Sequence, residues 1–93
     1  MAEVRKHVTI MGRVQGVWFR ASTRDTALAH SVNGWVKNTF AGHVEAVFEG
    51  EEQDVTAVIA WCHTGPSAAV VKEVKVAEEP YRSEFSTFSV KGW

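Results

Sequence analysis

The chain has 93 residues, 45% of them hydrophobic and 23% charged, with a formal net charge of −1 at pH 7. That size and balance predict one globular domain over residues 1–93. A disulfide-built fold is excluded because Cys62 is the single cysteine, and no apolar stretch approaches the roughly 20 residues of a membrane span. With no signal peptide evident, we expect a cytoplasmic protein. We also expect it to be a monomer.

The charge is unevenly distributed along the sequence. Residues 1–40 carry six basic and two acidic residues, a net +4, whereas residues 41–93 carry four basic and nine acidic residues, a net −5. No acidic residue lies between Val4 and Arg24. A basic stretch of this kind attracts small anions. The acidic second half argues against a nucleic-acid-binding domain, which is usually strongly basic throughout.

The hydrophobic pattern predicts strands and helices in a definite order. Strands are expected over residues 6–14, 35–37, 43–49, 69–76 and 85–90, and helices over 19–30 and 51–63. The order strand, helix, strand, strand, helix, strand, with an extra strand at the end, predicts an α+β fold. It is the split βαβ plan, a mostly antiparallel sheet with both helices on one face.

The stretch from Gly12 to Arg20 predicts an anion site. It is typical of a strand that ends at a glycine-containing loop and starts a helix with an arginine in the first turn. That arginine opposes the helix dipole unless an anion lies in the loop. Loop N–H groups, a helix N-terminus and one guanidinium together can hold a phosphate. A surface arginine without a role remains the alternative.

Asn38 closes the second predicted strand. An asparagine there is most often a turn residue. In a split βαβ fold, however, the end of the second strand and the loop after the first can lie close together. The Asn38 amide could then hydrogen-bond a water, because it has both donor and acceptor atoms.

The remaining chemistry-bearing side chains do not indicate a metal or cofactor. The aspartates and histidines are scattered without metal-ligand spacing: Asp25, Asp54, His7, His30, His43 and His63. Cys62 falls on the apolar face of a predicted helix, so we expect an inert core thiol.

Separated motifs in this chain closely resemble those of the acylphosphatases. They are Val14-Gln15-Gly16-Val17-Trp18-Phe19-Arg20, then Gly34-Trp35-Val36-Lys37-Asn38, then Gly42-His43-Val44-Glu45. The resemblance covers nearly the whole chain, and separated motifs at the expected spacing are far more specific than a lone glycine loop.

The resemblance implies a metal-free, cofactor-free hydrolysis of small acyl phosphates to a carboxylate and inorganic phosphate, on a ferredoxin-like fold. The phosphoryl group would be held by Arg20 and by the backbone N–H groups of Gln15, Gly16, Val17, Trp18 and Phe19. Asn38 would position the attacking water. From the charge distribution and the lack of a long apolar stretch we expect no nucleic-acid or membrane partner. The alternative is a non-catalytic module that binds a small anion on the same fold. Asn38 distinguishes the hydrolase from this module, because binding alone needs no water-orienting amide.

The chain departs from the family pattern at several positions. Trp18 stands where many members have glycine, and His30 falls at a usually aliphatic core position. The resemblance also suggests that the C-terminal carboxylate of Trp93 could pair with Arg20. A solvated tail is the alternative for that end of the chain.

Overall fold

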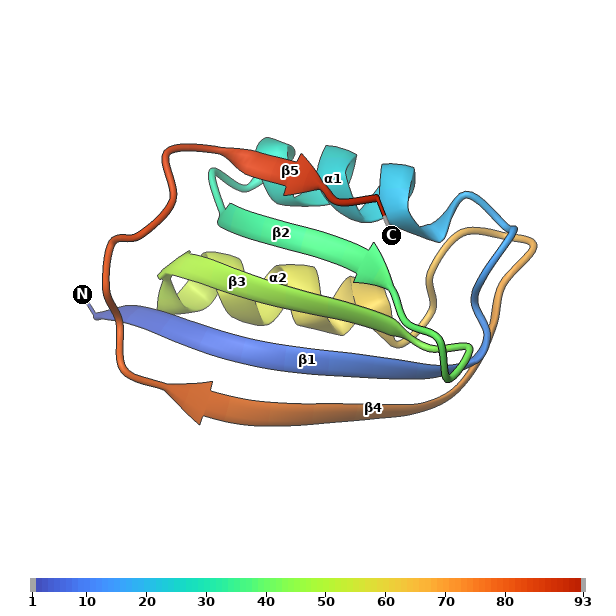
Figure 1. The fold of residues 1–93 in the computed structure, drawn as a ribbon. Coiled ribbons are helices and arrows are strands. Elements are labelled where there is room, and N and C mark those ends of the chain that lie inside the picture. The colour runs from blue at the N-terminus through green and yellow to red at the C-terminus, as the bar shows by residue number, and fades with distance from the viewer. Residues whose placement is uncertain (1, 93) are drawn as a thin grey trace.

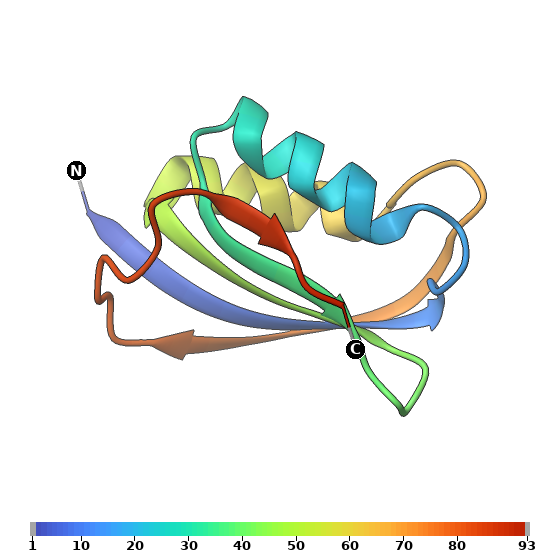
Figure 2. The same ribbon diagram turned by 45° about the horizontal axis from the view of Figure 1, so that its top comes forward.

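The computed structural model describes residues 2–92, which form a five-stranded sheet covered on one face by two helices (Figure 1). In chain order the elements are β1 (Glu3–Arg13), α1 (Phe19–Ala29), β2 (Asn33–Asn38), β3 (Val44–Glu51), α2 (Glu52–Cys62), β4 (Val70–Glu79) and β5 (Phe88–Val90). The sheet order is β4-β1-β3-β2-β5, antiparallel except for the β2–β5 pair. Figure 2 shows both helices on the same face of the sheet, as predicted for the split βαβ plan.

The strand ends differ from the predicted ones where polar residues pair across the sheet. β1 begins at Glu3 rather than residue 6, and β4 runs to Glu79 rather than residue 76. Opposed charges pair across these extensions, with Arg5 Nε 2.7 Å from Glu79 Oε1 in the antiparallel β1–β4 pair. A hydrophobic alternation carries no signal for such pairs. β5 is shorter than predicted and covers only residues 88–90.

The core lies between the sheet and the helices. Phe19, the first residue of α1, packs against Trp61 of α2 with ring centroids 5.4 Å apart. Phe48 of β3 and Phe88 of β5 stack at 5.6 Å. Cys62 is buried in this core, and burial raises the pKa of its thiol to about 12. The thiol therefore stays protonated at neutral pH, which agrees with the predicted inert core cysteine.

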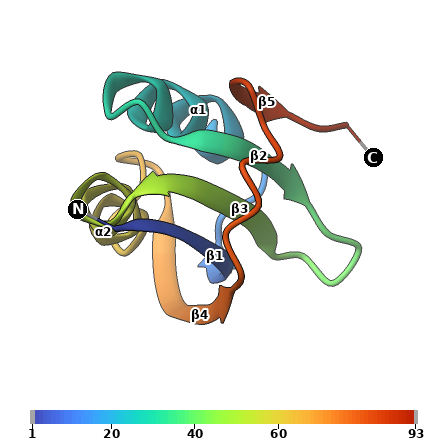
Figure 3. The same cartoon turned by 90° about the vertical axis from the view of Figure 1, so that its left-hand side faces the viewer.

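A buried arginine fixes the segment that crosses the end of the sheet from β4 to β5 (Figure 3). Arg5 Nε lies 2.7 Å from Glu79 and its Nη1 lies 2.7 Å from Glu84 and 3.4 Å from Glu49. Glu49 is 2% exposed and accepts hydrogen bonds from the backbone N–H groups of Arg82 and Glu84. This network directs the chain back across the sheet, so that β5 lies beside β2.

Candidate active site

The loop between β1 and α1 contains two residues with left-handed backbone conformations. Gly16 has φ 75° and Trp18 has φ 64°. A side chain at Gly16 would meet no atom within 4 Å, so the glycine faces open space and is needed for its backbone conformation. A tryptophan in this conformation costs roughly 1–2 kcal/mol. The loop thus holds a strained, non-glycine residue directly before the helix, as functional loops often do.

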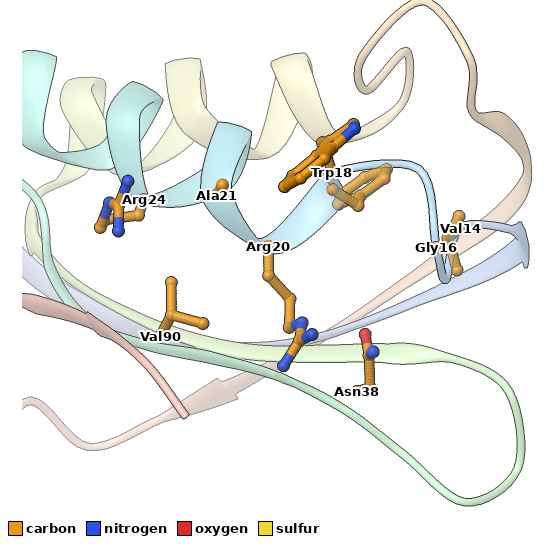
Figure 4. A pocket seen from close by; sticks show the side chains of 9 residues that line it. Val14, Gly16, Trp18, Arg20, Ala21, Arg24, Asn38 and Val90 are labelled. Carbon is orange, nitrogen blue, oxygen red and sulfur yellow. The ribbon is translucent and has the colours of Figure 1, made fainter. Parts of the chain in front are cut away.

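A cavity of about 350 Å³ opens in front of this loop and the start of α1. Five of the predicted site residues line it, namely Gly16, Trp18, Phe19, Arg20 and Asn38. In Figure 4 the Arg20 side chain extends from α1 toward Asn38 on β2. The structure therefore brings the arginine of one motif and the asparagine of the other to the same cavity.

The electrostatics of the cavity favour an anion. In the described part of the chain, the first turn of α1 contains no acidic side chain. The Trp18 side chain, at the N-cap, makes no capping hydrogen bond. The first N–H groups of an α-helix have no partner within the helix. These groups, the positive end of the helix dipole and the Arg20 guanidinium all present positive potential to the cavity.

Gln15 and Val17 are the predicted site residues that do not line the cavity. The side chain of Val17 packs against the core. The Gln15 amide donates hydrogen bonds to the backbone oxygens of Thr39, at 2.8 Å, and His43, at 2.9 Å. Thr39 follows Asn38 directly, so Gln15 ties the loop after β1 to the turn after β2. This contact could not be predicted from the sequence, because its partners are separated from Gln15 by 24 and 28 positions and leave no local pattern.

The C-terminal segment forms the other side of the cavity. Val90 lines it, and the carbonyl oxygen of Lys91 accepts a 3.2 Å hydrogen bond from Arg20 Nη1. The Lys91 N–H donates to Val36 of β2 at 2.8 Å. The suggested pairing of the Trp93 carboxylate with Arg20, and its alternative of a solvated tail, concern a residue outside the described part of the chain.

Among residues 2–92, no group of three or more histidine, cysteine, aspartate or glutamate side chains is arranged to hold a metal ion. In the same part of the chain no helix is long and apolar enough to cross a membrane.

Comparisons with known proteins agree with the fold and with the family resemblance seen in the sequence. A family model described as acylphosphatase matches residues 6–90. The acylphosphatase of Syntrophus aciditrophicus (strain SB) is 54% identical over 86 residues, covering 92% of this chain and 90% of that protein. That of Pelotomaculum thermopropionicum is 48% identical over 90 residues, covering 97% and 98%. The structure of an acylphosphatase from Coxiella burnetii superimposes with a TM-score of 0.91 at 39% identity, covering 96% of this chain and 93% of that one.

The chain is thus a ferredoxin-like α+β protein with a cavity at a helix N-terminus that is lined by Arg20 and Asn38. It belongs to the acylphosphatase family. The family resemblance and the fold inferred from the sequence are both confirmed.

Proposed function

We propose that this protein hydrolyses acyl phosphates to a carboxylate and inorganic phosphate. The observation that carries the proposal is the convergence of Arg20 and Asn38 on one cavity at the uncapped start of α1. The high identity to proteins named acylphosphatase over most of the chain supports the same reaction.

In the proposed mechanism the loop and Arg20 bind the phosphoryl group. The backbone N–H groups of residues 15–19 and the guanidinium surround its oxygens and stabilise the charge that they carry in the transition state. The Arg20 fork suits such planar, bidentate recognition. The hydrogen bond to Lys91 holds one edge of the guanidinium and leaves its other N–H groups for the substrate.

Asn38 orients the attacking water. The water oxygen forms a bond to phosphorus while the bond between phosphorus and the acyl oxygen breaks, and the carboxylate leaves with the electron pair. A carboxylate is a good leaving group, so positioning and electrostatic stabilisation suffice without a general acid or a metal. The water's proton passes to a phosphate oxygen.

We propose that residues 1–93 act as a single domain and as a monomer in the cytoplasm, with a small acyl phosphate as its partner and no nucleic acid. The buried, protonated thiol of Cys62 is compatible with a reducing compartment. Analytical ultracentrifugation at micromolar concentration tests whether the protein is a monomer.

The experiment that tests the reaction is phosphate release from benzoyl phosphate by the purified protein. The account predicts turnover by the native chain and its loss in Arg20→Ala and in Asn38→Ala. A protein that binds phosphate but releases none from benzoyl phosphate would instead be the non-catalytic anion-binding module.

A further inference from the structure

The segment between α2 and β4 packs against the first residue of α1. In Figure 2 this segment and the loop before α1 lie at the same end of the molecule. Gly65, within the segment, is buried against the ring of Phe19. A Cβ atom added to Gly65 would overlap Cε2 of that ring and lie 3.1 Å from its Cδ2 and Cζ atoms. Only a glycine therefore fits at this place beside the ring.

The end of α2 fixes the position of Gly65. The N–H groups of Thr64 and Gly65 both donate to the carbonyl oxygen of Trp61, at 3.0 and 2.8 Å. Gly65 has a left-handed φ of 67°, which glycine adopts without steric cost. The Trp61 ring in turn packs against the Phe19 ring, with centroids 5.4 Å apart. Trp61 and Gly65 together thus form a seat for the Phe19 ring.

The position of the Phe19 ring fixes the backbone on both sides of it. Phe19 is 1% exposed and lies directly between Trp18 and Arg20 at the start of α1. Its carbonyl oxygen accepts a 2.8 Å hydrogen bond from Thr23 Oγ1, which closes the first turn of the helix. The proposed phosphate cradle consists of the backbone N–H groups of residues 15–19 and the Arg20 guanidinium. A displacement of the ring therefore moves part of the cradle.

We propose that Gly65 is a positioning residue of the cradle. By seating the Phe19 ring, it sets where the N–H groups and the guanidinium meet the phosphoryl group. This inference rests on the proposed function and adds to it a residue that does not line the cavity. Electrostatic stabilisation requires well-placed donors, and a misplacement of about 1 Å can lower a rate about 100-fold. Gly65 thus acts on the reaction through Phe19, without touching the substrate.

The test compares the dissociation constant for inorganic phosphate, from isothermal titration calorimetry, with the melting temperature. In Gly65→Ala the added methyl group displaces the Phe19 ring. Phosphate binding should therefore weaken about five- to tenfold, the contribution of about one hydrogen bond. The value of kcat/KM for benzoyl phosphate should fall more steeply, because the cradle stabilises charge in the transition state.

Val47→Ala is the matched control for a loss of stability alone. Val47 is 2% exposed, but it faces the side of the sheet away from the helices. Side chains alternate along β3, and its neighbours Ala46 and Phe48 belong to the core between the sheet and the helices. Val47→Ala should lower the melting temperature, because it removes buried methyl groups. Its dissociation constant for phosphate should stay within about twofold of the native value.

Phe19→Leu tests whether the effect passes through the ring. Leucine lacks the Cε2 and Cζ atoms that the added methyl group would meet. In the Phe19→Leu background, Gly65→Ala should therefore fill space and tighten phosphate binding about twofold, whereas it weakens binding in the native background. A residue that contributes only to stability would not produce this reversal. The comparison of Phe19→Leu with the double variant does not require Gly65→Ala to fold alone.

The proposal is overturned if Gly65→Ala binds phosphate as tightly as the native protein, or if Val47→Ala weakens binding as much as Gly65→Ala does. It is also overturned if the double variant binds phosphate no more tightly than Phe19→Leu. Failure of the proposed function would appear separately, as absence of phosphate release from benzoyl phosphate by the native protein.

Discussion

Arg20 Nη1 donates a 3.2 Å hydrogen bond to the carbonyl oxygen of Lys91, so two residues 71 positions apart meet at the edge of the cavity. Lys91 is itself fixed to β2, through its N–H bond to Val36 and through its Nζ, which lies 4.5 Å from the centroid of the Trp35 ring. The orientation of the Arg20 guanidinium therefore depends on the chain end as well as on α1.

Two truncations test the contribution of Lys91. Deleting residues 91–93 removes the acceptor of the Arg20 hydrogen bond and should weaken inorganic phosphate binding about two- to fivefold, because a partly exposed contact contributes ~1 kcal/mol or less. Deleting residues 92–93 keeps an acceptor at Lys91 and serves as the control. Phosphate affinity is measured by calorimetry. If the protein that lacks residues 91–93 binds phosphate as tightly as the native protein, a positioning role for Lys91 is contradicted.

Substitution of Arg20 tests the cradle. Arg20→Ala should lower kcat/KM by a factor that corresponds to a loss of roughly 3–4 kcal/mol or more of transition-state stabilisation. The estimate is by analogy with the removal of an oxyanion donor. Arg20→Lys should restore only part of the loss, because an ammonium lacks the planar fork. The measurement is steady-state hydrolysis of benzoyl phosphate, with Arg13→Gln as the charge control. Near-normal kcat/KM in the alanine variant would refute the assignment.

The sequence was most informative where a function depends on neighbouring residues. The glycine loop, the helix that starts with Phe19 and Arg20, and the strand that ends at Asn38 are all visible in short motifs, and the structure contains each of them. The contacts of Gln15 with the β2–β3 turn, and of Arg20 with Lys91, could not be predicted in this way. They join polar groups that are distant in sequence and belong to no periodic pattern.

The buried network around Arg5 makes the stability of the fold depend on pH in the acidic range. Burial alone would raise the pKa of Glu49, but hydrogen bonds from the backbone of Arg82 and Glu84 and from Arg5 outweigh it and lower the pKa. A carboxyl with a lowered folded-state pKa stabilises the fold above its unfolded pKa, about 4.3, and this stability is lost as the pH falls through the folded value. The melting temperature should therefore fall as the pH drops from about 5 to 3.

Glu49→Gln isolates the contribution of that residue. It should cost about 1–3 kcal/mol of unfolding free energy at pH 7, because the charge that accepts these hydrogen bonds is removed. The variant should also lose part of the acid dependence below pH 5 in thermal melts. Glu52→Gln, an exposed position in the first turn of α2, is the control. An acid dependence identical to that of the native protein would show that Glu49 is not responsible.

Removal of metals tests the proposed chemistry. Because neither the cradle nor Asn38 requires a cation to act, hydrolysis of benzoyl phosphate should survive dialysis against EDTA with an unchanged kcat. Added magnesium should not increase the rate at saturating substrate. A dependence on magnesium that persists after correction for chelation of the substrate would overturn the mechanism.

The central claim is the division of labour between Arg20, which binds the phosphoryl group, and Asn38, which orients the water. Its most direct test is the effect of Asn38→Ala on kcat and, in the same preparation, on the dissociation constant for inorganic phosphate. Asn33→Ala, at the other end of β2 and outside the cavity lining, is the matched control. The account predicts that kcat falls by about 100-fold or more while the dissociation constant changes by less than about threefold. A phosphate affinity that falls as steeply as kcat would contradict it, because Asn38 would then bind the phosphoryl group itself.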